Sequence, residues 1–242
     1  MKRKSLRQCA LVTGGSKRIG KAISIKLAEM GYDIAIHYNN SKKEARDLSN
    51  ELKEKGAEAD IFSCDLNDRD QTKNLIPSVV KRFLNLSVLV NNASMFKPDS
   101  LLTATTNQLE QHFQIHVETP FLLTQTFAKI CKKGLIINIL DTNITKSSTK
   151  HFTYLLSKKN LLNLTTMSAV ELAPHIRVNG IAPGLILPPE EKSAEYLNRL
   201  AKKVPLKRKG SVDNITQTIQ FLIENDYLTG QVIFADGGEH LL

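Results

Sequence analysis

The sequence has few cysteines and no long uninterrupted hydrophobic run. Cys9, Cys64 and Cys131 form no CxxC pair and no Cys/His cluster with metal-ligand spacing, and their odd number argues against a disulfide framework. We interpret all three as small core residues and expect no metal site. No segment approaches the roughly 18 apolar residues that cross a bilayer, and the apolar run Cys9–Val12 is too short for a secretion signal. These absences predict a cytoplasmic protein without a membrane partner.

Positive charge is abundant but is not gathered in one place. The formal net charge is +9, which could indicate a nucleic-acid partner or anionic small-molecule ligands. Short basic clusters occur at 2–4, 202–203 and 207–209, without a single basic helix or arginine–aromatic interleaving. We therefore interpret the charge as a solvated surface and predict no nucleic-acid partner.

The length and residue balance are those of one globular domain over 1–242. Hydrophobic residues make up 41% and charged residues 24%, with 12 Gly and 8 Pro, which excludes a disordered chain. Short aliphatic or β-branched runs alternate with longer amphipathic stretches, a pattern typical of βαβ units. We predict a Rossmann-like α/β fold with a doubly wound, parallel, seven-stranded sheet and helices on both faces. The predicted strands are Cys9–Thr13, Asp33–His37, Ala59–Cys64, Val88–Val90, Leu135–Leu140, Arg177–Ile181 and Val232–Ala235, and the predicted helices lie near Ile19–Met30, Lys42–Lys55, Asp68–Arg82, Thr106–Lys132, Phe152–Leu172 and Val212–Glu224.

The segment 185–210 has the least regular pattern in the chain. It is too short for a second domain. We expect it to form a flap over a substrate site.

A glycine-rich turn joins the first predicted strand to the first predicted helix. It reads Thr13-Gly14-Gly15-Ser16-Lys17-Arg18-Ile19-Gly20. Backbone N–H groups at such a turn, together with the positive end of a helix, form a site for a pyrophosphate. The alternative is a tight turn without a ligand, because a glycine-rich loop alone is weak evidence.

The region that selects between NAD and NADP contains no carboxylate. In a NAD-preferring site an acidic side chain about 20 residues after the glycines binds the ribose 2′-hydroxyl. Here the stretch reads Asn39-Asn40-Ser41-Lys42, and Lys17 and Arg18 add positive charge nearby. We therefore predict a preference for NADP(H), although Asn and Ser are also common turn formers.

Four later motifs occur in the order and spacing of a known family. They are Cys64-Asp65-Leu66, Asn91-Asn92-Ala93-Ser94, Tyr154-Leu155-Leu156-Ser157-Lys158 and Asn179-Gly180-Ile181-Ala182-Pro183-Gly184. With the glycine turn they resemble the short-chain dehydrogenase/reductase family, from about residue 8 to Asp236-Gly237-Gly238. The resemblance implies an NADPH-dependent homotetramer. The cofactor-binding residues that it implies are Gly14, Lys17, Arg18, Ile19, Asn39, Asn40, Ser41, Asp65, Leu66, Asn92, Ala93, Ser94, Tyr154, Lys158, Pro183 and Gly184.

Tyr154 and Lys158 are the first two candidate catalytic residues. Their spacing of four residues brings both side chains to one face of a helix. We expect the Lys158 ammonium to stabilise phenolate and to lower the pKa of Tyr154 from about 10, so that the tyrosine acts as an acid. The alternative is a surface pair, since this spacing also occurs by chance.

Asp141 is the third candidate, and it points to a particular substrate. Most family members have a serine here, about a dozen residues before the tyrosine. An ionised carboxylate only accepts hydrogen bonds, so it suits a carbonyl oxygen poorly. It suits a C=N group better, because the nitrogen must gain a proton as hydride reaches the carbon.

Arg18, Ser94 and Phe96 accompany Asp141, and the combination resembles the pteridine reductases and the bacterial dihydromonapterin/dihydrofolate reductases. This resemblance implies a pterin or folate lying between Phe96 and the nicotinamide, with Arg18, Ser94, Asp141 and Tyr154 in contact with it.

Two departures and two other functions remain open. His116 stands where the family usually has an asparagine that organises a proton-relay water, which a histidine could bind through one nitrogen. Leu185-Ile186, after Pro183-Gly184, lacks the threonine that many members use. The alternatives are a carbonyl reductase, such as a 3-oxoacyl-[acyl-carrier-protein] reductase, and a binding module that has kept the fold without turnover.

Overall fold

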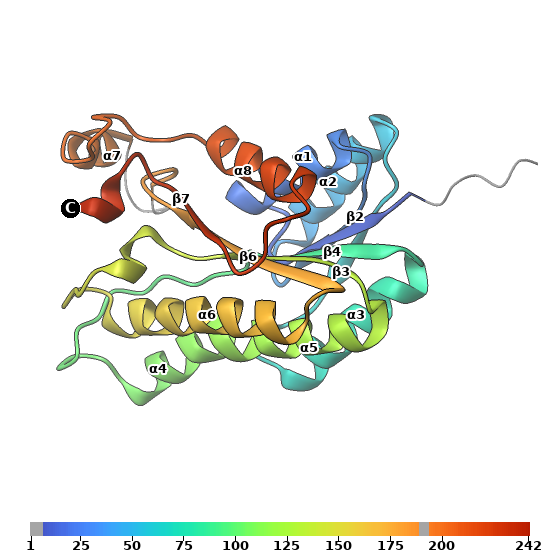
Figure 1. The fold of residues 1–242 in the computed structure, drawn as a ribbon, viewed down its shortest axis with the longest axis horizontal. Coiled ribbons are helices and arrows are strands. Elements are labelled where there is room, and N and C mark those ends of the chain that lie inside the picture. The colour runs from blue at the N-terminus through green and yellow to red at the C-terminus, as the bar shows by residue number, and fades with distance from the viewer. Residues whose placement is uncertain (1–6, 189–193) are drawn as a thin grey trace, which may run out of the picture.

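The computed structural model describes residues 7–188 and 194–242 as one parallel sheet of seven strands between two layers of helices (Figure 1). This arrangement confirms the predicted fold class. The strands are β1 Cys9–Val12, β2 Asp33–Tyr38, β3 Ala59–Ser63, β4 Leu86–Asn91, β5 Gly134–Ile139, β6 Ile176–Pro183 and β7 Val232–Ala235. The helices are α1 Arg18–Glu29, α2 Lys42–Glu54, α3 Arg69–Arg82, α4 Thr106–Phe113, α5 Thr119–Cys131, α6 Phe152–Glu171, α7 Ala194–Ala201 and α8 Val212–Glu224. Within the described residues, none of the helices is both long and apolar enough to cross a membrane.

The strand order places a ligand crevice near the middle of the sheet. The order is β3-β2-β1-β4-β5-β6-β7, and every neighbouring pair is parallel. The chain runs outward from β1 to β3 and then returns to the other side of β1 with β4. In open parallel sheets, ligands bind beyond the carboxyl ends of the strands where the order reverses in this way. The glycine turn after β1 and Asn92 after β4 meet at this position.

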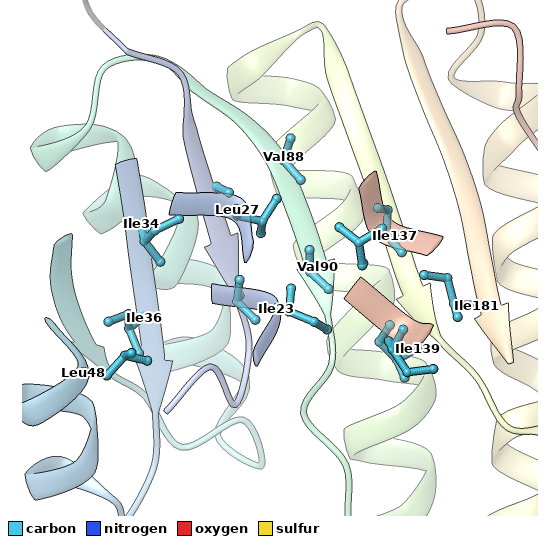
Figure 2. Packing of buried hydrophobic residues seen from close by; sticks show 14 of the residues in the cluster. Ile23, Leu27, Ile34, Ile36, Leu48, Val88, Val90, Ile137, Ile139 and Ile181 are labelled. Atoms are coloured by element: carbon cyan, nitrogen blue, oxygen red, sulfur yellow. The ribbon is translucent and has the colours of Figure 1, made fainter. Parts of the chain in front are cut away.

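Both faces of the sheet are covered by amphipathic helices, which bury their apolar side chains against it. Helices α1, α2 and α8 bury aliphatic side chains such as Ile23, Leu48 and Ile219 against one face, as Figure 2 shows for most of this cluster. Helices α3, α5 and α6 cover the other face, where Phe127 is fully buried. Each fully buried Leu or Ile side chain contributes about 1.5–3 kcal/mol relative to exposure. Two-sided burial explains why the strands read as continuous apolar runs rather than alternating ones.

The predicted helical stretch near Thr106–Lys132 is confirmed, but it is not one regular α-helix. The structure has α4, then a π-helical turn at Gln114–Glu118, then α5, with Lys132 in the left-handed conformation at φ 59° after the last turn. A π turn adds one residue to a helical turn, which apolar spacing of three and four residues does not reveal. The turn changes which side chains of this stretch face the rest of the molecule.

The segment 185–210, predicted as a flap, is less irregular than its pattern indicated. Its middle contains the amphipathic helix α7, whose Leu197 and Ala201 are buried. Eight residues complete little more than two turns, so their periodicity is a weak signal. Residues 189–193 of the predicted flap lie outside the described residues.

The cysteines lie where a core interpretation places them. Cys9 and Cys64 are buried and Cys131 is half-buried, and all three are free thiols. Burial raises the pKa of the Cys64 and Cys131 thiols to about 11, which keeps both protonated near neutral pH.

Candidate active site

The glycine turn is held close to α1 and β4 by two glycines. Gly14 has φ +59°, a conformation that suits glycine. A Cβ atom at Gly20 would lie 2.1 Å from the Gly14 carbonyl oxygen and 2.6 Å from Asn92 Nδ2. Only a residue without a side chain allows this approach, so Gly20 brings the turn and Asn92 together.

Thr13 joins the ends of β1 and β4 through its hydroxyl group. Thr13 Oγ1 donates to the Val90 carbonyl at 3.2 Å and accepts from the backbone N–H groups of Asn92, at 2.9 Å, and Ala93, at 3.0 Å. Asn92 Nδ2 in turn donates to the Thr13 carbonyl at 2.8 Å. Sequence inspection assigned no role to Thr13, although its position directly before the first glycine was a usable signal.

His37 supports the glycine turn from below, and sequence inspection missed it. The Gly14 N–H donates to His37 Nδ1 at 2.9 Å, which leaves the ring proton on Nε2, 3.0 Å from the Cys64 carbonyl that accepts it. Burial lowers the pKa of His37 to about 4. The ring is therefore neutral near pH 7 and acts as a fixed brace between β2, β3 and the turn.

A cleft of about 460 Å³ opens over the ends of β1 and β4. Asn40 is exposed beside Ser41, and the other predicted cofactor residues outside its lining are Tyr154, Lys158, Pro183 and Gly184. The predicted residues that line it are Gly14, Lys17, Arg18, Ile19, Asn39, Ser41, Asp65, Leu66, Asn92, Ala93 and Ser94.

The first turn of α1 faces this cleft with its backbone N–H groups available. Lys17 precedes the helix, no side chain of the described residues caps it, and its first turn contains no acidic residue. Uncapped N–H groups and the positive end of a helix are the groups that bind phosphate oxygens. The residues present therefore fit a dinucleotide pyrophosphate.

Lys17, which lines the cleft, is paired with an acidic group that sequence inspection missed. Lys17 Nζ lies 2.7 Å from a carboxylate oxygen of Glu44, in the first turn of α2. The Ser16 and Ser41 hydroxyls are 2.7 Å apart, and Asn39 Nδ2 donates to Asp65 at 3.4 Å. Lys17 is therefore neutralised in part by Glu44, although no carboxylate follows β2 directly.

The three predicted catalytic side chains meet at the carboxyl end of β5. Tyr154 Oη donates to Asp141 Oδ2 at 2.8 Å. Lys158 Nζ donates to the Ile139 carbonyl at 2.7 Å and lies 5.8 Å from the centre of the Tyr154 ring. Asp141 is itself fixed, because its Oδ1 accepts from the backbone and side-chain N–H groups of Asn143. Tyr154 and Lys158 are both buried.

The expected lowering of the tyrosine pKa is wrong. Burial, and then the charge and hydrogen bond of Asp141, raise the pKa of Tyr154 well above 10. Burial lowers the pKa of Lys158 to about 8, against an opposing effect of Asp141. The physical reason is that the lysine ammonium is bonded to a backbone carbonyl while the carboxylate lies directly on the phenol. The phenol is therefore held in its protonated form.

Comparison with known proteins assigns the chain to a family. The family described as enoyl-(acyl carrier protein) reductase matches residues 14–240. The chain belongs to the short-chain dehydrogenase/reductase family. Among curated members, the 3-oxoacyl-[acyl-carrier-protein] reductase FabG of Staphylococcus epidermidis is 31% identical over 98% of this chain and 100% of its own length. The dihydromonapterin reductase of Escherichia coli is 30% identical over 96% of both chains.

Two solved structures of the family superpose on nearly the whole chain. The FolM alternative dihydrofolate reductase 1 of Brucella suis, in complex with NADP, has a TM-score of 0.94 and 37% identity, over 99% of this chain and 97% of its own. The Brucella canis protein, also complexed with NADP, has a TM-score of 0.92 and 37% identity over the same shares. The resemblance to this family and to its pterin and folate reductases is confirmed.

The predicted substrate residues of this family member lie around Tyr154 and the cleft. Half of the Phe96 surface is exposed; its ring lies edge-on to Tyr154 at 4.8 Å and stacks on His151 at 4.2 Å. Arg18 is exposed and donates to the Pro188 carbonyl at 2.6 Å. Phe96 and Tyr154 thus come together, while Arg18 contacts the segment that follows β6.

His116, at the usual asparagine position of the family, has both ring nitrogens engaged. Nε2 lies 2.8 Å from Ser94 Oγ and 3.4 Å from the Met95 N–H, and Nδ1 lies 2.8 Å from Ser157 Oγ. Both ring nitrogens thus have protein partners in the structure, whereas the sequence left open a role of one nitrogen in binding a relay water. Burial first, and then the charges of Lys158 and His112, keep the pKa of His116 well below 6.5.

Proposed function

We propose that this protein is an NADPH-dependent reductase that transfers hydride to the C=N bond of a dihydropterin or dihydrofolate. The observation that carries the proposal is the 2.8 Å hydrogen bond from Tyr154 to the Asp141 carboxylate. Asp141 stands where carbonyl-reducing members have a serine hydroxyl, and its carboxylate suits a substrate that gains a proton on nitrogen. The similarity to dihydromonapterin and FolM dihydrofolate reductases supports the same assignment.

NADPH fits the cleft over β1 and β4. The uncapped first turn of α1 would hold the pyrophosphate, and Ser41 and Lys17 would hold the 2′-phosphate. Tyr154, Lys158, Pro183 and Gly184 would approach the nicotinamide end. Bound there, NADPH supplies the hydride that reaches the substrate carbon. The FolM proteins of two Brucella species crystallised with NADP support this choice of cofactor.

The chain's own residues deliver the proton that balances the hydride. Tyr154 holds its proton near neutral pH and gives it to the substrate nitrogen. The Lys158 ammonium then stabilises the phenolate that forms. Asp141 is only half-buried, so it can pass a proton from solvent back to Tyr154 across 2.8 Å. Carbon gains hydride and nitrogen gains a proton, so the C=N bond becomes an amine.

A flat substrate would lie against the exposed Phe96 ring, beside Tyr154 and within reach of Ser94. The described parts of the segment 185–210, residues 185–188 and 194–210, would cover it as a flap. The bond from Arg18 to the Pro188 carbonyl supports this role, because it ties the start of that segment to the glycine turn.

We also propose a cytoplasmic homotetramer formed by this single domain of 1–242. Helices α5 and α6 expose the large apolar side chains of Phe121, Met167 and Val170 to solvent, 48%, 71% and 82% of their surface. Exposed apolar side chains of this size favour burial in a subunit interface. Size-exclusion chromatography with light scattering measures the assembly, and a monomer at micromolar concentration would contradict it.

The competing function is reduction of a 3-oxoacyl thioester, favoured by the similarity to FabG reductases over nearly the whole chain. NADPH oxidation is measured with dihydrofolate, 7,8-dihydropterins and an acetoacetyl thioester as substrates. The proposal expects the highest kcat/KM with a dihydropterin or dihydrofolate. A far higher value with the thioester overturns it.

Asp141→Ser separates the two functions by the sign of its effect. Serine cannot pass a proton from solvent to Tyr154 as the Asp141 carboxyl group does, so reduction of the pterin falls about 10²–10⁴-fold. The same change restores the usual family arrangement for a ketone, so a carbonyl reductase keeps or gains activity. Asp141→Asn is the control that preserves shape, and it should also lose pterin reduction.

A further inference from the structure

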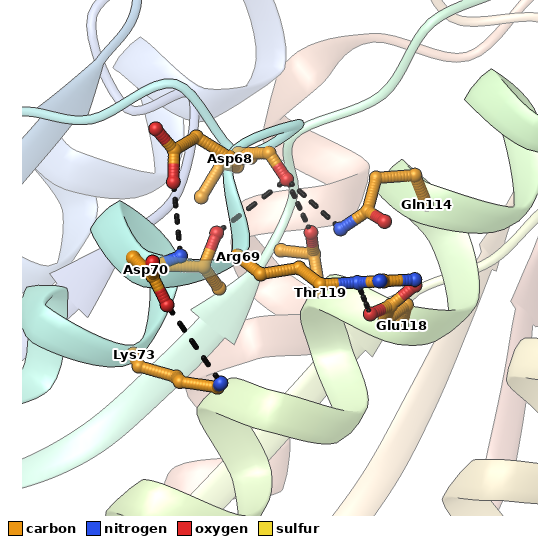
Figure 3. A network of polar contacts seen from close by, with 9 residues as sticks. Asp68, Arg69, Asp70, Lys73, Gln114, Glu118 and Thr119 are labelled. Atoms are coloured by element: carbon orange, nitrogen blue, oxygen red, sulfur yellow. Dashed lines mark hydrogen bonds and ion pairs between the residues drawn. The ribbon is translucent and has the colours of Figure 1, made fainter.

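The π-helical turn Gln114–Glu118 is anchored to the cofactor side of the molecule. Gln114 Nε2 and Thr119 Oγ1 both donate to the Leu66 carbonyl, at 3.3 and 2.8 Å. Arg69, in the first turn of α3, is paired with Glu118. Figure 3 shows these side chains together. With its neighbours fixed in this way, His116 at the centre of the turn is held in one orientation.

The His116 ring connects a cleft residue to the catalytic helix. The ring is 1% exposed. Ser94, which lines the cleft, is 2.8 Å from Nε2, and Ser157, in α6 between Tyr154 and Lys158, is 2.8 Å from Nδ1. The ring also lies edge-on to Tyr154, at 5.3 Å between ring centres.

The proton positions in the hydrogen-bonded series Ser94–His116–Ser157 follow from the bond that Ser157 makes. The Ser157 hydroxyl donates to the Tyr154 backbone carbonyl at 2.7 Å, so its oxygen must accept from His116. The ring proton is therefore on Nδ1, and Nε2 is a bare acceptor. Nε2 receives the Met95 N–H at 3.4 Å and the Ser94 hydroxyl at 2.8 Å. The other acceptor for the Ser94 hydroxyl, the Met95 carbonyl, is farther away, at 3.5 Å.

The Ser94 hydroxyl therefore donates its one hydrogen bond to His116. Toward the cleft, its oxygen can only accept hydrogen bonds. We infer that His116 makes Ser94 an obligate hydrogen-bond acceptor, so that the site selects substrates that present an N–H donor at this position. The chemical class is an amino-substituted heterocycle, such as the 2-amino-4-oxo ring of a pterin. This inference rests on the proposed function for its choice of substrate.

The same polarity decides between two uses of Ser94. A phosphate oxygen accepts hydrogen bonds, so it cannot pair with an oxygen that has no proton left to donate. An amino group can. Ser94 therefore belongs to substrate recognition rather than to the cofactor phosphates. An asparagine at position 116, the usual family residue, has both an amide donor and an amide acceptor and would leave the direction of the Ser94 hydroxyl open.

Substrate discrimination tests the inference. The kcat/KM values are compared for a 7,8-dihydropterin and for its 2-oxo counterpart, which places a carbonyl where the amino group was. The parent enzyme should prefer the amino compound by about ten- to a hundredfold, because two facing acceptors repel each other and neither gains a hydrogen bond. Ser94→Ala and His116→Asn should each reduce this ratio about tenfold, and the double variant should do no more than one change alone.

The control measurement is the NADPH dissociation constant of Ser94→Ala. It should stay within about twofold of the parent value, because the inference gives Ser94 no hydrogen bond to the cofactor that the change could remove. A tenfold weakening would show that Ser94 holds a cofactor phosphate and would overturn the inference. An unchanged substrate ratio in Ser94→Ala would overturn it too.

A measurement independent of turnover separates this inference from the proposed function. The ¹⁵N NMR shifts of the His116 ring in the parent protein report which nitrogen carries the proton. A protonated Nδ1 and a bare Nε2, with the Nε2 shift changed in Ser94→Ala, support the polarity even if no pterin is reduced. A protonated Nε2 overturns it even in an active pterin reductase.

Discussion

Two buried histidines, His37 and His116, flank the candidate site and use opposite tautomers. His37, 2% exposed, accepts from the Gly14 N–H through Nδ1 and donates through Nε2 to the Cys64 carbonyl. His116, 1% exposed, donates through Nδ1 to Ser157 and accepts through Nε2 from Ser94. The main partners of His37 are backbone groups with fixed roles, whereas hydroxyls can turn. On the cofactor side, His37 is held by backbone groups whose donor and acceptor roles cannot change. On the substrate side, His116 fixes the direction in which hydroxyl groups donate their hydrogen bonds.

The largest expected effect is the loss of turnover when a catalytic residue on the substrate side is replaced. Tyr154→Phe removes the phenolic proton and should reduce kcat about 10²–10⁴-fold, and Lys158→Met should also remove most turnover. Both variants should still bind NADPH in a fluorescence titration, because the glycine turn and its support at His37 are untouched, although each variant changes a predicted contact at the nicotinamide end. Near-normal turnover of Tyr154→Phe with the best substrate would contradict the assigned proton donor.

The next effect breaks the cofactor side. His37→Phe leaves the Gly14 N–H and the Cys64 carbonyl without their buried partner. Each unpaired group costs about 1–3 kcal/mol, so the dissociation constant for NADPH should rise about tenfold or more and stability at pH 7 should fall. The matched variant His116→Phe should change the NADPH constant far less. An equal rise of the NADPH dissociation constant in both variants would contradict the assignment of His37 to the cofactor side and His116 to the substrate side.

Acid should destabilise the protein partly through His37. Its pKa is about 4 in the folded chain, below the ordinary 6.5, so the unfolded chain takes up this proton first as pH falls. The free energy of unfolding should therefore decrease from about pH 6.5 to about pH 4, by about 3 kcal/mol for this group. Urea unfolding at several pH values measures the slope, and His37→Phe should flatten it. A parallel slope in the variant would assign the acid sensitivity to other groups.

A smaller effect tests the preference of the cofactor side for NADPH. Asn39 follows β2, where a NAD-preferring site has its carboxylate, so Asn39→Asp should place negative charge near the 2′-phosphate. We expect kcat/KM with NADPH to fall about tenfold while that with NADH is retained, since like charges that face each other repel. Equal or better efficiency of the parent with NADH would sink the predicted preference.

The smallest expected effect concerns the exposed pair of Lys17 and Glu44, 2.7 Å apart. Glu44→Gln should free the ammonium for the 2′-phosphate and tighten NADPH about two- to fivefold, the range of an exposed ion pair. The gain should shrink in high salt, because exposed charges are screened. Titration of NADPH at two salt concentrations checks both statements, and weaker binding at low salt would speak against a role of Lys17 at the phosphate.

The motifs with strong local signals were predictable because they depend on short-range geometry. A strand followed by a glycine turn and a helix indicates the pyrophosphate site, and the four-residue spacing of Tyr154 and Lys158 places both on one face of α6. The contact between Asp141 and Tyr154 agrees with the chemistry expected of them. The π turn and α7 were missed because one added residue or eight helical residues barely change the apolar pattern.

The sequence by itself determined the strand and helix order, the family and the side chains available for the chemistry. Tertiary structure alone decided their electrostatic state. The phenol of Tyr154 is held protonated because folding places it in a buried site on the Asp141 carboxylate, while Lys158 turns to the Ile139 carbonyl. The direction of the Ser94 hydroxyl likewise depends on a histidine 22 residues away and a serine 63 residues away. Hydrogen-bond direction and desolvation depend on neighbours distant in the chain, and local spacing carries no record of them.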